Sequence, residues 1–242
     1  MASRSLYNGL DRKSIDGPWQ DGGMGPARIF AVRHGQSQAN LAHQEAGDRP
    51  LHYAPGDHEV TLTGLGRTQA AALGRMLAAL PAGEAPEAVW CSPYLRAIDT
   101  WRVAQGEWGS RPLPVTVDER LRDQEAGAFA PFNLAAIRER FPEELARREA
   151  EGPYAFRPPG GESLADVVVR LRDLLADLRE RAAGRRVLIV AHDSVVLGLR
   201  HVLAGGPDAD LGAVLEFAPV LNGSVSVWDR TRLVRFNDVT HL

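Results

Sequence analysis

Two histidines and two arginines occupy positions in this sequence from which they could act together on one anion. Arg33 and His34 directly follow one largely apolar stretch, and His192 directly follows another. Arg96 comes a few residues after a third apolar stretch. Ligands bind to α/β sheets where strands end and helices begin. We therefore expect these four side chains to converge at one edge of a sheet.

This set of side chains is suited to holding a phosphoryl group and to accepting it. A phosphoryl group carries about −1.5 to −2 charge near neutral pH, and a planar, permanently charged guanidinium grips two oxygens at once. A neutral imidazole is an adequate nucleophile, because its unperturbed pKa is about 6.5. We expect His34 to accept the phosphoryl group as a phosphohistidine, while Arg33 and Arg96 bind the oxygens of that group. A protonated His192 would donate a hydrogen bond to an equatorial oxygen of the transition state.

A leaving alkoxide needs a proton, and residues 121–127 offer two carboxylates for this step. Asp123 and Glu125 lie in a predicted loop after a short strand. Either can act as the general acid if burial or a bound phosphate raises its pKa. Asp193 is a candidate N-cap of the helix that follows His192. Since a carboxylate beside a phosphate is unfavourable, we expect the Asp193 side chain to turn away and the Asp193 N–H to face the site.

Short apolar runs alternate with helical patterns, which is typical of an α/β sheet covered by helices on both faces. The continuous apolar run at 187–191 indicates a mostly parallel sheet. We predict one domain over residues 27–242 with a helical lid at about 130–160, and a flexible extension at 1–26. The other predicted strands are 27–32, 88–91, 115–117, 225–228 and 233–236. The predicted helices are 64–80, 93–105, 133–150 with a break near Pro142, 163–183 and 194–203.

Composition limits the partners and the compartment. The 242 residues carry a formal net charge of −3, which favours neither a nucleic acid nor a membrane as partner. Cys91 is the single cysteine, which favours a reducing, cytoplasmic location and a buried structural role. We expect no membrane span and no signal peptide. No metal-ligand spacing is evident, so we expect no metal and no cofactor; nothing in the sequence excludes a homodimer.

A series of motifs in order resembles those of the histidine phosphatase superfamily, which has the phosphoglycerate mutase-like fold. The resemblance covers roughly residues 28–230. It implies a metal-independent enzyme that works through a phosphohistidine. The motifs are V-R-H-G-Q-S-x-x-N (32–40), L-T-x-x-G-x-x-Q-A (62–70), S-P-x-x-R-A-x-x-T (92–100), L-x-D-x-x-x-G (121–127), G-G-E-S (160–163) and V-L-I-V-A-H (187–192).

The resemblance also implies roles for individual residues. His34 is the implied nucleophile, with Arg33, Arg96 and His192 completing the phosphate pocket. The family's proton donor is a Glu, and it falls on Asp123. Because Asp is one methylene shorter, Glu125 stays a candidate. The implied substrate contacts are Gly35, Gln36, Ser37, Asn40, Asp193 and Arg148.

Residues 141–163 further resemble the fructose-2,6-bisphosphatase branch, in which the arginine at position 148 helps to bind a distal phosphate. This chain departs from that branch at Asp193 and Leu197, where the branch has Gln and Arg. The mutase branch likewise has an Arg near position 197. We therefore expect a phosphomonoesterase acting on a small sugar phosphate or phosphoglycerate. A phosphoglycerate mutase-type isomerase and a non-catalytic phospho-ligand or protein-binding module remain as alternatives.

Overall fold

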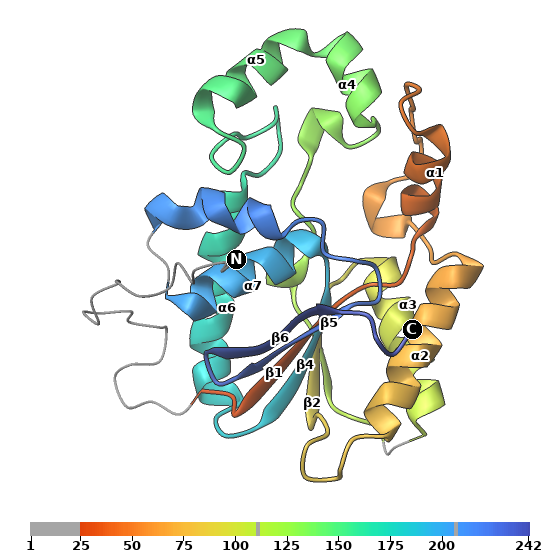
Figure 1. Ribbon diagram of the computed structural model, residues 1–242, viewed down its shortest axis with the longest axis vertical. Helices are drawn as coiled ribbons and strands as arrows, with labels where there is room; N and C mark the ends of the chain where they lie inside the picture. The colour runs from red at the N-terminus through yellow and green to blue at the C-terminus, as the bar shows by residue number, and fades with distance from the viewer. Residues whose placement is uncertain (1–24, 110–111, 206–207) are drawn as a thin grey trace, which may run out of the picture.

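A six-stranded sheet with the order β3-β2-β4-β1-β5-β6 forms the centre of the molecule (Figure 1). The structure is a computed structural model that describes residues 25–109, 112–205 and 208–242. The first four strands in this order run parallel, and β5 pairs antiparallel with β1 and β6. The predicted mostly parallel sheet is therefore confirmed. The strands are β1 (Arg28–Arg33), β2 (Ala88–Cys91), β3 (Val115–Val117), β4 (Arg186–Ala191), β5 (Val225–Asp229) and β6 (Arg232–Asp238).

Helices cover both faces of this sheet, as predicted, and the break at Pro142 separates α4 from α5. The α-helices are α1 (Gln38–Ala46), α2 (Gly64–Ala78), α3 (Leu95–Trp108), α4 (Leu134–Arg140), α5 (Pro142–Glu151), α6 (Leu164–Arg181) and α7 (Asp193–Ala204). Short 3-10 segments are η1 (Asp57–Glu59), η2 (Glu119–Leu121), η3 (Gly127–Phe129) and η4 (Asp208–Phe217).

Helix α1 and the four 3-10 segments were not expected from the sequence. Helix α1 buries no residue, so its sequence lacks the apolar period that reveals a helix packed on a core. It begins instead at a reciprocal cap, in which Ser37 and Asn40 bond each other's backbone N–H. His43 lies in this helix, whereas His52 and His58 lie in exposed segments.

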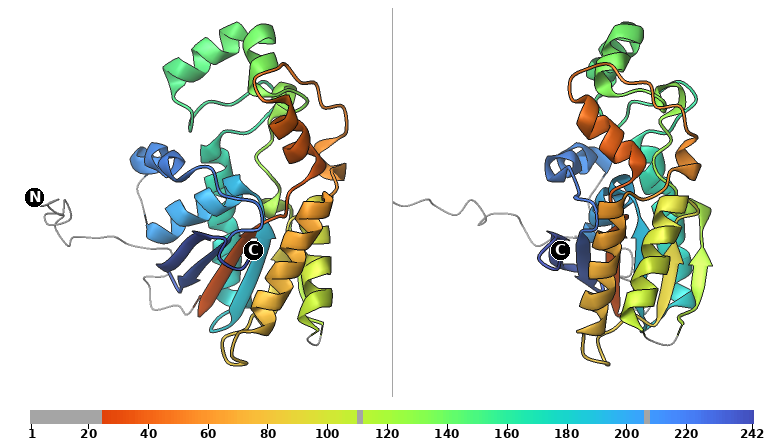
Figure 2. Two further views of the ribbon diagram at one scale, coloured as in Figure 1. Left: turned by 45° about the vertical axis from the view of Figure 1, so that its right-hand side comes forward. Right: turned by 90° about the vertical axis from the view of Figure 1, so that its right-hand side faces the viewer.

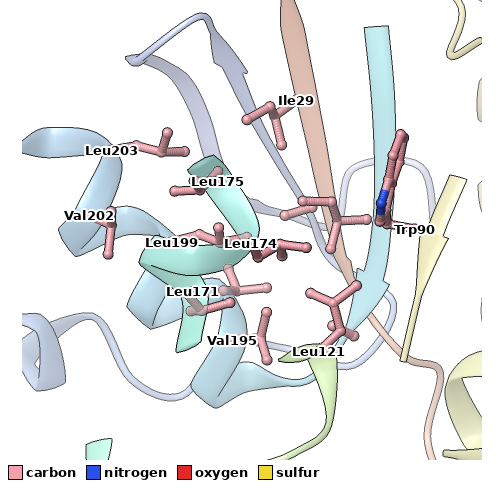
Figure 3. Close-up of a cluster of buried hydrophobic side chains, with 14 of the residues drawn as sticks. Ile29, Trp90, Leu121, Leu171, Leu174, Leu175, Val195, Leu199, Val202 and Leu203 are labelled. Carbon is pink, nitrogen blue, oxygen red and sulfur yellow. The ribbon is translucent and has the colours of Figure 1, made fainter. Parts of the chain in front are cut away.

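The two faces of the sheet carry separate apolar cores. Successive strand residues point to opposite faces, so a continuous apolar strand is buried on both sides. Ile29 and Ile189 belong to the core under α6 and α7, shown in Figure 3. Phe30 and Leu188 belong to the core under α2 and α3. Figure 2 shows the helix pairs on either side of the sheet. Burial of each large side chain contributes about 1.5–3 kcal/mol.

The topology brings three strand ends to one edge of the sheet. Strand β4 lies between β1 and β2, and Arg33 pairs in register with Ala191. Cys91 pairs with Val190. The residues that follow β1, β2 and β4 are thus neighbours across the sheet. Helices α4 and α5 lie beyond this edge, where the sequence predicted a helical lid (Figures 1 and 2).

The predicted N-terminal extension lies outside the described residues, apart from Gly25 and Pro26. Within the described ranges, no helix has the length and apolar character needed to cross a membrane.

Candidate active site

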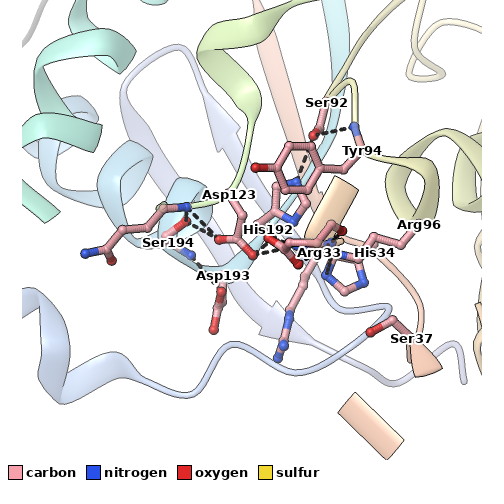
Figure 4. Close-up of polar contacts among 12 residues, drawn as sticks. Arg33, His34, Ser37, Ser92, Tyr94, Arg96, Asp123, His192, Asp193 and Ser194 are labelled. Atoms are coloured by element: carbon pink, nitrogen blue, oxygen red, sulfur yellow. Dashed lines mark hydrogen bonds and ion pairs between the residues drawn. The ribbon is translucent and has the colours of Figure 1, made fainter. Parts of the chain in front are cut away.

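His34 and His192 lie side by side at the carboxyl edge of the sheet (Figure 4). Their ring centroids are 5.2 Å apart and their planes meet at 65°. Backbone hydrogen bonds extend the sheet ladder to them: the His34 N–H donates to the Ala191 carbonyl at 2.9 Å. The Ser92 N–H donates to the Val190 carbonyl at 3.0 Å in the same way. The predicted convergence of the two histidines therefore follows from the pairing of β1 with β4.

A cavity of about 730 Å³ opens above this edge, and most of the predicted charged residues line it. His192 lies behind them and is fully buried. The cavity also extends under α4 and α5, which contribute apolar side chains to its walls. The lining residues at the sheet edge include Arg33, His34, Arg96, Asp123, Asp193 and Ser194.

The hydrogen bonds of His34 leave one ring nitrogen with a lone pair. Its Nδ1 lies 2.8 Å from the Gly35 carbonyl oxygen. A carbonyl only accepts, so Nδ1 carries the proton and Nε2 does not. Arg96 Nε donates to Nε2 at 3.2 Å. Burial lowers the pKa of His34 well below its ordinary value, and the charges of His192, Arg96 and Arg33 lower it further. His34 is therefore a neutral imidazole near pH 7.

Two glycines allow the loop after β1 to pack against the start of α2. A Cβ on Gly35 would overlap the Gly66 carbonyl oxygen, and a Cβ on Gly66 would overlap the Gln36 carbonyl oxygen. The Gly35 N–H donates to Thr100 Oγ1 at 3.0 Å. This close packing fixes the backbone on which His34 is carried.

The two arginines at the site are held in different ways. Arg96 is 4% exposed, and its guanidinium donates to the Asp57 carbonyl and carboxylate at 2.6 and 2.9 Å. It also donates to Asp123 Oδ2 at 3.0 Å. Arg33 Nη1 donates to the Val220 carbonyl, and Arg33 Nε is buried without a hydrogen-bond partner. The carboxylates of Asp57 and Asp123 thus accept from the guanidinium of Arg96, which could equally donate to the oxygens of a phosphate.

Asp123 is the carboxylate that the structure brings to the histidines. Its Oδ1 accepts from Ser194 Oγ and from the Gln124 N–H, both at 2.8 Å. Burial alone would raise the pKa of Asp123, but His192, Arg96 and the Ser194 hydroxyl together hold that pKa well below its ordinary value. Because the Arg96 charge is permanent, Asp123 is ionised in this arrangement.

His192 is enclosed by polar neighbours. Its Nε2 lies 2.8 Å from Ser92 Oγ, and its Nδ1 lies 3.3 Å from Asp123 Oδ2 without hydrogen-bond geometry. Burial lowers the pKa of His192 to about 3, although Asp123 opposes the shift. An anion bound beside this ring would raise its pKa and allow the ring to donate a hydrogen bond.

The position of Asp193 differs from the prediction. His192 is the N-cap of α7, and Asp193 is its first residue. The Asp193 side chain accepts from the Ser194 N–H at 3.0 Å, and Asp193 is among the residues that line the cavity. Burial raises the pKa of Asp193, the charge of Arg33 lowers it, and the charge of Asp123 raises it further. The extended backbone of His192 moves the helix start one residue earlier than expected.

The remaining predicted contacts divide into two groups. Ser37, Asn40 and Arg148 line the cavity, with Arg148 exposed on α5. Gly35 and Gln36 do not line it. The Gln36 side chain accepts from Thr63 Oγ1 at 2.9 Å and donates to Gln44 at 3.3 Å.

The second candidate acid lies outside the cavity. Glu125 is exposed, and its carboxylate pairs with Arg122 at 3.0 Å. Of the two candidate acids, Asp123 is therefore the one that lines the cavity together with His34.

Several residues at the site were not singled out from the sequence. Asp57 lies in a polar stretch without a motif, and its contact with Arg96 spans 39 positions. Asn222 Nδ2 donates to the His34 carbonyl at 3.2 Å and to Asn40 Oδ1 at 3.1 Å. Ser92 stands in a quoted motif, which was the available signal for its role beside His192.

Cys91 has the structural role predicted for it. It is buried, and burial raises the pKa of its thiol to about 12. Among the described residues, no group of three His, Cys, Asp or Glu side chains is arranged to hold a metal ion.

Comparison with known proteins identifies relatives of this fold and site. The profile of the histidine phosphatase superfamily (branch 1) matches residues 29–235. A 2,3-bisphosphoglycerate-dependent phosphoglycerate mutase from Methylobacterium radiotolerans is 31% identical over 212 residues, covering 85% of this chain and 94% of that protein. Chicken 6-phosphofructo-2-kinase/fructose-2,6-bisphosphatase is 31% identical over 171 residues, covering 71% of this chain and 31% of that protein.

A solved structure resembles the fold over most of both chains. Mycobacterial glucosyl-3-phosphoglycerate phosphatase matches with a TM-score of 0.69 and 28% identity, covering 88% of this chain and 99% of that one. The family profile spans the sheet and both strand ends that carry the histidines. This chain belongs to the histidine phosphatase superfamily, branch 1.

Proposed function

We propose that this protein is a phosphomonoesterase that transfers the phosphoryl group of its substrate to His34 and then to water. The observation that carries this proposal is the state of His34. It is neutral, and its unprotonated Nε2 accepts a hydrogen bond from Arg96 Nε at 3.2 Å, so its lone pair is freed when Arg96 turns to a bound phosphate. A nucleophile and a phosphate-binding cation therefore occupy one point of the cavity.

In the first step, the phosphate of a monoester binds to Arg33 and Arg96 and displaces carboxylate oxygens from Arg96. His34 Nε2 attacks phosphorus, so that a P–N bond forms and the ester P–O bond breaks. Asp123 gives a proton to the leaving oxygen. Asp123 first receives this proton from a substrate that binds as its monoanion. The negative charge of the bound substrate raises the pKa of Asp123 and so favours this transfer.

In the second step, water attacks the phosphorus of phospho-His34. Asp123, now a carboxylate, takes a proton from this water, and the P–N bond breaks. Asp123 then passes this proton to the departing phosphate or to solvent, inorganic phosphate leaves, and neutral His34 and ionised Asp123 are restored. The group that gave the proton in the first step thus accepts one in the second.

The charge of the transition state is met by preorganised donors. His192 lies beside His34 and donates once bound phosphate has raised its pKa. The N-terminus of α7, which begins at Asp193, adds its dipole. Removal of one such donor commonly costs about 3 kcal/mol, or roughly a hundredfold in rate.

Steady-state assays with purified protein test this proposal. We expect phosphate release from a panel of phosphomonoesters, with rates unchanged by a metal chelator. His34→Ala should lower turnover by about a thousandfold or more, because the nucleophile is lost. His52→Ala, at an exposed histidine outside the cavity, should retain normal rates. Full activity of His34→Ala would contradict the mechanism, and phosphate binding without any turnover would favour the binding-module alternative.

A mutase is the second candidate function, because relatives more than 30% identical are named phosphoglycerate mutases. Asp193 and Leu197 line the cavity here, so neither offers a cation to the carboxylate or second phosphate of a phosphoglycerate. Conversion of 3-phosphoglycerate to 2-phosphoglycerate, measured beside phosphate release, separates the two activities. We expect phosphate release to dominate.

A further inference from the structure

The cavity above His34 is much larger than a phosphate group requires. Its volume of about 730 Å³ lies within the range of about 300–1,000 Å³ that is typical of pockets for drug-sized ligands. The groups that take part in the proposed reaction line only the end at the sheet edge. We call the remainder, which lies under α4 and α5, the outer chamber.

The outer chamber has mainly apolar walls. Helices α4 and α5 and the loop after α5 provide one side, and α6, α7 and η4 provide the other. Because the same cavity contains His34, one substrate molecule can place its phosphate at His34 and the rest of its structure in the outer chamber. Its apolar lining residues include Phe129, Ile137, Leu145, Phe156, Leu164 and Leu197.

Aromatic contacts hold these walls in place. The rings of Phe129 and Phe156 are both buried, with centroids 6.0 Å apart and planes 25° apart. Phe141, between α4 and α5, packs on Phe129 at 5.1 Å. Arg147 lies over the outer face of Phe156, 4.5 Å from its centroid. The chamber is therefore formed by packed side chains, which lowers the cost of ordering them when a ligand binds.

Charge disfavours a polar, multiply anionic ligand at the inner boundary of the chamber. Asp193 lines the cavity, and Leu197 follows one turn later on the same face of α7. A carboxylate repels a second anion, and a leucine gives it no donor. Arg148 also lines the cavity, and it borders a neighbouring groove beside Glu149.

We propose that the substrates of this protein are phosphomonoesters with a large apolar alcohol part, such as a long alkyl or an aryl group. This inference rests on the proposed function, because the phosphate at His34 places the apolar part in the outer chamber. It differs from the small sugar phosphate or phosphoglycerate that the sequence suggests. Each methylene buried in the chamber increases binding by up to about fourfold.

A series of primary alkyl phosphates tests the inference. Ethyl, butyl, hexyl and octyl phosphate release alcohols of nearly equal acidity, so the chemical step is matched and chain length is the variable. Below micelle-forming concentrations, kcat/KM should rise with length, by up to about fourfold per methylene until the chamber is filled. Glycerol 1-phosphate and 3-phosphoglycerate should react no better than ethyl phosphate.

Two matched variants assign the effect to the outer chamber. Leu145→Asn places a polar side chain of similar size in the wall, and it should lower the octyl-to-ethyl ratio of kcat/KM by about tenfold. Leu65→Asn makes the same exchange at a leucine that is 54% exposed and outside the cavity. That variant should keep the wild-type ratio.

The outcomes separate this inference from the proposed function. Phosphate release that is equal along the series, or that falls with length, would overturn the apolar substrate class and leave the phosphatase intact. A rise with length that Leu145→Asn does not reduce would also overturn it. No release from any alkyl phosphate or from p-nitrophenyl phosphate would overturn the proposed function, and the inference with it.

Discussion

At the scale of the residue, the reactivity of His34 depends on which ring nitrogen carries the proton. The Gly35 carbonyl oxygen accepts a hydrogen bond from Nδ1–H at 2.8 Å, which leaves the lone pair on Nε2, facing Arg96. The same arginine that would hold a phosphate thus disfavours protonation of the nucleophile. Burial acts in the same direction. Burial and the surrounding positive charge thus keep the proposed nucleophile neutral.

This environment predicts an unusual pH dependence. His34 attacks only when it is neutral, and its pKa in the folded protein is lowered well below about 6.5, the ordinary value. As pH falls through about 6.5, an ordinary histidine would become protonated and inactive, whereas His34 stays neutral. We expect kcat/KM to show no loss of activity near that pH. The pH profile of kcat/KM measures this, and an acid limb near pH 6.5 would contradict it.

The choice of proton donor predicts how activity depends on the leaving group. Asp123→Asn removes the acid, so hydrolysis of ethyl phosphate should slow by about a hundredfold or more. The loss should be smaller for p-nitrophenyl phosphate, whose leaving group needs no proton.

Glu125→Gln is the matched control for the proton donor. This carboxylate is 47% exposed and paired with Arg122, so both substrates should react at normal rates. A leaving-group effect in Glu125→Gln that is absent from Asp123→Asn would reverse the assignment.

At the scale of the element, the position of the nucleophile depends on how closely α2 approaches the loop after β1. No side chain fits at Gly66, because its Cα faces the Gln36 carbonyl. Gly64, two residues earlier in the same helical turn, has open space around it. The helix start therefore contains one glycine that the packing requires and one that it does not.

This contrast predicts opposite results for two alanine variants. Gly66→Ala should destabilise the protein by about 1–3 kcal/mol through overpacking. It should also lower kcat, because the His34 loop is displaced. Gly64→Ala should be neutral or stabilising by about 0.4–1 kcal/mol, through lower entropy of the unfolded chain. Urea unfolding and kcat measured on both variants check this, and equal effects would contradict the packing argument.

At the scale of the whole molecule, the sheet order makes a site from residues that are distant in sequence. The positions of His34 and His192 could be predicted, because each follows a strand with a clear apolar run. The contact of Asp57 with Arg96 could not be predicted, because it depends on a polar loop crossing over α3. The lining of the outer chamber was equally hidden, since Phe129 and Phe156 meet only in the folded lid. Local patterns reveal strand ends but not the loops that close over them.

Acid should destabilise the folded molecule through carboxylates that are paired on its surface. A hydrogen bond from Arg157 lowers the pKa of Asp166 to about 2, although partial burial opposes this shift. The stabilisation from Asp166 is complete above about pH 3.9, its value in the unfolded chain, and is lost as pH falls toward the folded pKa. Asp166→Asn should therefore be less stable than the wild type at pH 6 and similar to it near pH 2. Asp173→Asn, on the exposed part of the same helix, should match the wild type in urea unfolding at both pH values.

The most direct test of the account is to locate the phosphoryl group during turnover. The enzyme is mixed with a phosphomonoester, quenched within milliseconds under alkaline conditions that preserve phosphohistidine, and digested for mass spectrometry. We expect one acid-labile phosphate on the peptide that contains His34, and none when His34 is replaced by alanine. A phosphorylated residue elsewhere, or turnover without any phosphorylated intermediate, would contradict it.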